Sequence, residues 1–175
     1  MAKKYRKMLT DWQATYIQSL FRLIESQSKA TIVNWCVDYA EVRLLPIYEA
    51  ACPGDERPKD AIHAARAWMA GEIKLPAAKA VILDCHAAAR EAKNPVAEAT
   101  ARAIGQCAST IHAPTHSAGL MFYGALAVAY DTLGIDAPWE ALLDAAEAEC
   151  GRMEAALRSV AVENEPNPAK INWKC

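Results

Sequence analysis

Two histidines four residues apart are the pair in this chain most suggestive of metal chemistry. His112 and His116 lie on one face if their segment is helical, so both imidazoles could reach one ion. His86 or Cys85 could supply a third ligand. No glutamate follows His112, however, and Pro114 disturbs a helix between the pair. The pattern leaves two readings open: a metal or small-ligand site, or histidines that form hydrogen bonds with their neighbours.

Cysteine and histidine also occur close together, as a nucleophile and its base would. Cys85 and His86 are adjacent, so on a helix their side chains point about 100° apart and cannot form the required hydrogen bond. Cys107 and His112 are five residues apart, which is also a poor spacing. The sequence therefore does not favour a cysteine nucleophile.

Carboxylates and arginines are mixed along the middle of the chain. The candidate acid–base carboxylates are Asp38, Glu41, Asp55, Glu72 and Asp84. The arginines of the same region are Arg43, Arg57, Arg66, Arg90 and Arg102. An arginine within an alanine-rich helix face needs a carboxylate partner if it is buried. We therefore expect structural ion pairs rather than acid–base catalysis, and we expect Trp35 and Trp68 to lie in the core rather than to form ligand platforms.

Several functional classes lack their motifs here. The chain contains no G-x-x-x-x-G-K-[ST] or G-x-G-x-x-G phosphate-binding loop and no G-x-S-x-G nucleophile motif. Its formal net charge of −2 does not favour a nucleic-acid partner, and no apolar run reaches the length of a membrane span. The one basic cluster is at the N-terminus, where residues 1–8 are expected to form a solvated arm. We expect no cofactor, no nucleic acid and no membrane partner.

The elements that must position these side chains are helices. Apolar residues make up 53% of the chain, and the commonest of them is alanine, the best helix former, whereas alternating β-branched runs are missing. The composition predicts an all-α single domain over residues 1–175, a bundle or stack of about seven antiparallel helices joined by short connections. The expected helices are 9–28, 29–45, 58–70, 76–93, 95–112, 115–133 and 138–160, with an extended tail over 163–175 lying on the surface.

Local signals mark where these helices begin, break and end. Thr10 or Asp11 could cap the first helix, and Asn94 followed by Pro95 is a strong start signal for the fifth. Pro46 predicts a kink or a restart, and Pro114 predicts a break near residue 112. The stretch from 119 to 130 is so apolar that we expect it near the centre of the bundle.

The stretch from Cys52 to Ile73 has the clearest punctuation. Asp55 can accept backbone hydrogen bonds in the turn, and Pro58 suits the first helical position. Gly71 can end the helix in the left-handed conformation. The residues expected on one face of this helix are Ile62, Ala65, Arg66 and Met69.

Six cysteines are dispersed over the predicted helices. None forms a C-x-x-C pair, and no signal-peptide pattern opens the chain. We interpret them as reduced and mostly buried in a cytoplasmic protein, with Cys175 the most exposed.

Five segments, in order and spacing, resemble a bacterial family. They are WCVDYAE (35–41), PGDERPKDAIHAARAWMAGEI (53–73), CHAAAREA (85–92), ARAIGQCASTIHAPTHSAG (101–119) and YGALA (123–127). The chain is similar over Lys29 to Tyr130 to the immunity proteins of polymorphic toxin systems, the all-α group numbered five. It departs from the family pattern at His63, where an acid is usual, and at Pro114, where a small or apolar residue is usual.

The resemblance implies a small helical, non-enzymatic, cytoplasmic protein that binds and neutralises a cognate protein toxin. The positions matching the family's polar set are Asp38, Glu41, Asp55, Arg57, Arg66, Trp68, His86, Arg90, Arg102, His112 and His116. No catalytic role is implied for them. Two alternatives stay open: a metal- or small-ligand-binding helical protein, possibly an enzyme, with a His/carboxylate/Arg pocket, and a structural helical module that forms homo-oligomers.

Overall fold

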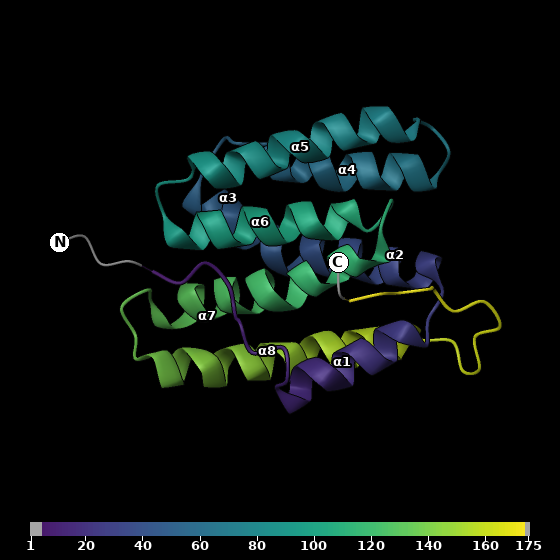
Figure 1. The fold of residues 1–175 in the computed structure, drawn as a ribbon. Helices are drawn as coiled ribbons and strands as arrows, with labels where there is room; N and C mark the ends of the chain where they lie inside the picture. The colour runs from purple at the N-terminus through teal and green to yellow at the C-terminus, as the bar shows by residue number, and fades with distance from the viewer. Residues whose placement is uncertain (1–4, 174–175) are drawn as a thin grey trace.

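The structure is a computed structural model that describes residues 5–173. Alanine-rich segments form most of its helices. The described residues contain helices and no strand, which confirms the predicted all-α class. The helices run approximately parallel or antiparallel to one another (Figure 1), as expected for helices joined by short connections. The α-helices are α1 Thr15–Glu25, α2 Lys29–Tyr39, α3 Leu45–Ala51, α4 Arg57–Met69, α5 Leu75–Glu91, α6 Pro95–Ser109, α7 Ala125–Leu133 and α8 Trp139–Val160.

Pro46 interrupts the second predicted helix without ending it. Proline has no amide hydrogen, so Pro46 cannot donate to the carbonyl of Val42 four residues earlier. The chain widens here into a π-helical segment, η1 (Ala40–Leu44), in which the Leu45 amide donates to the Ala40 carbonyl. It then continues as α3, which confirms the predicted restart. As a result, α2, η1 and α3 follow one another without a loop.

Helix α6 lies at the centre of the bundle, between α4 and α5 on one side and α7 on the other (Figure 1). Ten of its 15 residues are buried, and most of these are small. At Gly105 the packing against α5 is close, because a Cβ atom there would lie 2.6 Å from Cε1 of His86. A larger residue at this position would have to displace α5 or the imidazole.

Pro114 breaks the chain where the sequence predicted, but the effect extends further. Helix α6 ends at Ser109, and the chain then forms a 3₁₀ turn, η2 (Pro114–Ser117), and a second π-helical segment, η3 (Leu120–Gly124), before α7 begins. The stretch from 119 to 130 is central as predicted, since all of it except Tyr123 is buried. Even with this apolar stretch, no helix among residues 5–173 has the length and apolarity to cross a membrane.

The predicted start of the first helix is wrong. Residues 9–14 are not helical, and α1 begins at Thr15 without a side-chain cap. Instead, the Leu9 amide donates to the carbonyl of Phe122 in η3 at 2.9 Å, and the Asp11 carboxylate accepts from the Gln13 amide at 2.9 Å to form a turn. Local capping signals could not reveal this tertiary hydrogen bond.

The described part of the basic arm contacts the bundle, although the Arg6 and Lys7 side chains stay exposed. Lys7 pairs with Glu98 at 2.7 Å, and the Arg6 guanidinium lies 4.0 Å from the ring centroid of Trp139. The Arg6 carbonyl also accepts a hydrogen bond from the Tyr130 hydroxyl at 2.8 Å. The first four residues of the predicted arm, which include Lys3 and Lys4, lie outside the described residues.

The C-terminal tail turns after the end of α8 and runs back along the bundle (Figure 1). Buried Gln27 fixes it twice, because its side-chain oxygen accepts from the Val162 amide at 2.7 Å and its carbonyl accepts from the Ala169 amide at 2.8 Å. The Trp173 ring stacks on Phe21 with 4.1 Å between centroids. The tail thus covers part of the apolar face of α1.

The described cysteines are free thiols, as predicted. Cys36, Cys85, Cys107 and Cys150 are buried and Cys52 is half-buried. Cys175, predicted to be the most exposed, lies outside the described residues.

Candidate functional site

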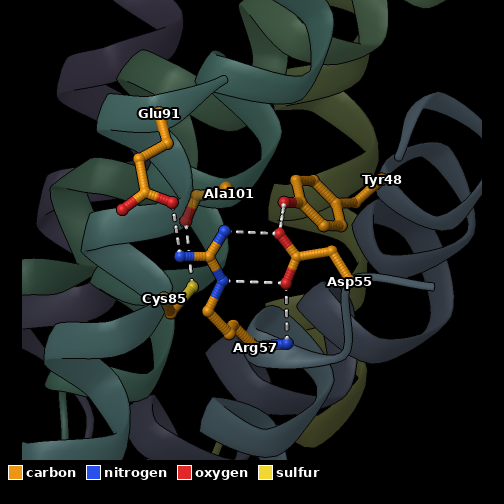
Figure 2. Close-up of polar contacts among 6 residues, drawn as sticks. All are labelled: Tyr48, Asp55, Arg57, Cys85, Glu91 and Ala101. Carbon is orange, nitrogen blue, oxygen red and sulfur yellow. Dashed lines mark hydrogen bonds and ion pairs between the residues drawn. The ribbon is translucent and has the colours of Figure 1, made fainter. Parts of the chain in front are cut away.

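Asp55 and Arg57 form an ion-pair clamp at the start of α4 (Figure 2). Oδ1 of Asp55 accepts a hydrogen bond from the backbone amide of Arg57 at 3.2 Å, which is the backbone contact predicted for this turn. Its two oxygens also bind Nε and Nη2 of Arg57 at 2.9 and 2.7 Å. This two-point contact needs the planar fork of arginine, which lysine lacks.

The clamp connects three helices. The Tyr48 hydroxyl on α3 donates to Asp55 at 2.8 Å, and Nη1 of Arg57 donates to Glu91 at the end of α5, also at 2.8 Å (Figure 2). The Arg57 side chain, with the Tyr48 hydroxyl, lowers the pKa of Asp55 from 3.8 to about 2. Asp55 is therefore an ionised structural carboxylate at neutral pH and is poorly suited to acid–base catalysis.

Asp38, Glu41 and Arg66 form a second group, where α2 and η1 meet α4. Nη2 of Arg66 donates to Asp38 at 2.9 Å and also to Glu41. All three side chains are more than a third exposed, so each pair contributes at most about 1 kcal/mol. Half-buried Trp68 lies on the same helix as Arg66, and Nζ of Lys29 is 5.5 Å from its ring centroid.

His112 and His116 lie together at the break between α6 and η2. Their ring centroids are 4.9 Å apart in an edge-to-face arrangement. Nδ1 of His116 is hydrogen-bonded to Gln106 at 2.7 Å, whereas Nδ1 of His112 is buried without a partner among the described residues. Burial lowers the pKa of both imidazoles, so both are neutral at pH 7.

His86 packs between α5 and α6, over Gly105. Its Nδ1 is likewise buried without a described partner. Burial, reinforced by the charges of Arg102 and Arg90 and by His116, lowers the pKa of His86 to about 4. Arg102 is half-buried and Arg90 is exposed, so these two charges reach solvent while the imidazole stays neutral.

The structure brings the three histidines into one region without completing a catalytic or metal-binding set. Within residues 5–173, no group of three or more His, Cys, Asp or Glu side chains could hold a metal ion. The Cys85 thiol donates to the Ala101 carbonyl at 3.3 Å, and burial raises its pKa to about 12 (Figure 2). Cys85 therefore lacks the thiolate character that a nucleophile needs.

The most deeply buried carboxylate, Glu149 on α8, is absent from the residues that sequence reasoning selected. Its side chain is 0% exposed and accepts hydrogen bonds from the Tyr39 hydroxyl at 2.7 Å, from Nε and Nη2 of Arg43 at 3.0 and 3.2 Å, and from Nε of Arg152 at 2.8 Å. Burial opposes its ionisation, but the hydrogen bonds from Arg43, Tyr39 and Arg152 outweigh burial and lower its pKa.

A signal for Glu149 does exist in the sequence. It falls at helical spacing between Ala146 and Met153, on the apolar face of α8, where a charge requires a partner. Arg152 lies three residues later on the same helix, but Tyr39 and Arg43 come from α2 and η1, more than a hundred residues away, so only the fold identifies these two partners.

The chain matches the model of a known protein family. Residues 22–156 match the family model described as "Imm-5 like putative immunity protein", and this stretch is well over half of the chain.

This chain belongs to the Imm-5 like family. The match confirms the resemblance carried by the sequence motifs and extends it on both sides, from within α1 to within α8. The Asp55–Arg57 clamp, the Arg66 group, the histidines and Glu149 all lie inside the matched stretch. The comparisons with curated proteins and with solved structures returned no match.

Proposed function

We propose that this protein is an immunity protein that binds a cognate protein toxin and neutralises it by binding alone, without catalysis. The family match over residues 22–156 carries the proposal. The geometry is compatible with it, because the predicted polar residues mostly pair with one another and do not converge on one reaction centre. We further propose that the protein acts in the bacterial cytoplasm as part of a polymorphic toxin system, without a cofactor, nucleic acid or membrane.

Co-expression with the neighbouring reading frames tests the proposal. We expect one of them to encode a protein with a toxic domain whose expression stops growth, and we expect this chain to restore growth and to co-purify with that domain. An empty vector and an immunity protein from an unrelated toxin pair serve as controls. The proposal is wrong if no neighbouring product binds, or if the purified chain restores growth by chemically modifying the toxin or its substrate with turnover.

A further inference from the structure

An open groove of about 420 Å³ lies on the surface between α2–η1 and α8. It is adjacent to the Glu149 group and separate from the Asp55–Arg57 clamp. Its lining residues are Trp35, Asp38, Tyr39, Val42, Arg43, Arg152, Ala156, Ser159 and Val160.

The groove gathers exposed apolar side chains. Val42 is 76% exposed and Val160 is 50% exposed, and both belong to the few large apolar residues that reach solvent among residues 5–173. Single exposed apolar residues are ordinary, but here two line one concave surface, together with half-buried Tyr39 and Ala156. Val42 lies in the π-helical segment that Pro46 imposes, and π-bulges are frequent at functional sites.

The groove also has unused hydrogen-bond donors, which belong to a positively charged group of side chains. Arg43 and Arg152 share the single carboxylate of Glu149, so the three residues together carry one net positive charge. Among the described residues, Arg152 donates through Nε alone and Arg43 through Nε and Nη2, which leaves terminal N–H groups of both guanidiniums free. Their side chains are 42% and 59% exposed.

The acidic side chain of the lining, Asp38, belongs to a separate group. Arg66 binds it together with Glu41, and these three residues carry one net negative charge, so Asp38 does not occupy the free N–H groups of Arg43 and Arg152. A carboxylate that approached Arg43 and Arg152 would therefore contact two guanidiniums that the buried Glu149 carboxylate already holds in place. Bidentate binding of carboxylates is the geometry that arginine favours.

We propose that this groove is the docking site for a segment of the toxin that presents apolar side chains next to a carboxylate, with the carboxylate bound by Arg43 and Arg152. The inference rests on the proposed function and names the contact face that it requires. A second copy of this chain is a poorer occupant. In a two-fold pairing the groove would face itself and bring the two positive groups together.

Binding to the purified toxin domain tests the contact face. In the full-length chain, Val42→Asp and Arg152→Gln should each weaken toxin binding at least tenfold, measured by titration calorimetry. Leu83→Asp, at a 60% exposed position on α5, and Arg158→Gln, at an exposed arginine elsewhere on α8, are matched controls that should stay within twofold of the original chain. Unchanged thermal melting of all four variants excludes unfolding as the cause.

These outcomes separate the inference from the proposed function. If the toxin domain binds the original chain and both groove variants equally well, the groove is not the contact face, although the immunity role stands. If no toxin domain binds the original chain, the proposed function fails, and a probe that needs no toxin decides about the groove.

That probe is 4-phenylbutyrate, which joins an apolar body to a carboxylate, compared with its uncharged amide by backbone NMR titration. We expect shifts confined to α2, η1 and α8, at least fivefold tighter binding of the carboxylate, and loss of this preference in Arg152→Gln. Equal binding of acid and amide, or shifts only elsewhere, overturns the inference. Concentration-dependent dimerisation that Val42→Asp abolishes would also overturn it, because it assigns the groove to a second copy.

Discussion

At the residue scale, the Glu149 group shows how a charge is kept inside an apolar helix face. An isolated carboxylate there would be strongly disfavoured, and four hydrogen bonds from Tyr39, Arg43 and Arg152 replace its lost hydration. Both arginines remain partly exposed to solvent, so only the Glu149 carboxylate is fully desolvated. The group connects α2 and η1 to α8 and fixes one wall of the groove.

Replacing Glu149 by Gln should lower the free energy of unfolding by about 2 kcal/mol, because charge-assisted hydrogen bonds become neutral ones and one acceptor is lost. Urea denaturation measures the change. Glu147→Gln, at an exposed position on the same helix, is the matched control and should change stability by less than about 0.5 kcal/mol. Equal effects of the two substitutions would contradict the importance of the buried carboxylate.

The Asp55–Arg57 clamp leads to a second prediction. Asp55→Asn should lower the free energy of unfolding at pH 7 by about 1–2 kcal/mol, because the two-point ion pair is lost. Glu91→Gln should cost less than about 1 kcal/mol, since the Glu91 side chain is 64% exposed. Thermal melting of both variants provides the comparison, and a larger loss for Glu91→Gln would show that the outer contact is the stronger one.

At the scale of elements, interruptions of regular helix shape this fold as much as the helices do. Pro46 widens the α2–α3 rod and leaves Val42 exposed, while Pro114 separates α6 from α7 by a 3₁₀ turn and a π-helical segment. The two π-helical segments approach each other at Gly124, because a Cβ atom there would lie at van der Waals distance, 3.4 Å, from Cδ1 of Leu44. The central position of α6 depends on small residues at such contacts.

Gly105 provides a test of this close packing. Gly105→Ala would place a Cβ atom against the His86 ring and should destabilise the protein by about 1–3 kcal/mol, although alanine favours helix elsewhere. Adding His86→Ala should recover part of the loss, which a double-mutant cycle measures. Gly151→Ala on α8 is the control: no atom lies within 4 Å of the new methyl group, so stability should rise by about 0.5–1 kcal/mol. If the Gly105 and Gly151 variants behave alike, the contact with His86 is not limiting.

At the scale of the whole molecule, the polar residues that sequence reasoning grouped together are separated into distinct regions. The clamp around Asp55 joins α3, α4 and α5, the Arg66 group joins α2 and α4, and the histidines occupy the α5–α6–η2 region. The first two groups tie helices to one another, and partial burial lowers the pKa of the three imidazoles. Their main shared consequence is that stability depends on pH.

Stability should fall in acid in two steps. The folded-state pKa of His86 is about 4, below its ordinary 6.5, so the unfolded chain binds the proton first and the free energy of unfolding decreases as pH falls from about 6.5 to 4. His112 and His116 act in the same direction. Asp55, whose pKa is lowered to about 2, stabilises the fold above pH 3.8 and loses this effect as pH falls towards 2.

Urea denaturation at a series of pH values measures this profile. His86→Gln should reduce the change in the free energy of unfolding between pH 6.5 and 4. His63→Gln, at an exposed histidine, is the matched control. A profile that keeps its slope in His86→Gln would show that other groups bind the proton.

Local sequence signals predicted much of the chain correctly, and the reason is that they act within a few residues. The Asn94 cap is observed, since its side chain accepts from the Val96 amide at 2.8 Å, and Gly71 has the left-handed conformation that ends α4. The cap expected at Thr10 or Asp11 failed because the Leu9 amide binds the distant Phe122 carbonyl. The Asp55–Arg57 pair was partly predictable, since both residues belong to one turn, whereas Glu91 came from another helix.

By itself, the sequence determined the all-α class, the approximate helix limits, the reduced cysteines and the family, because alanine content, proline and glycine positions and motif order are local properties. Only the tertiary structure decided which charges pair, because Glu149 and Arg43 are 106 residues apart and meet only when α8 packs on η1. It alone also placed Val42, Val160, Arg43 and Arg152 around one groove. Burial of apolar side chains brings those helices together, and the positions of charged residues in the sequence do not indicate which helices will pack against each other.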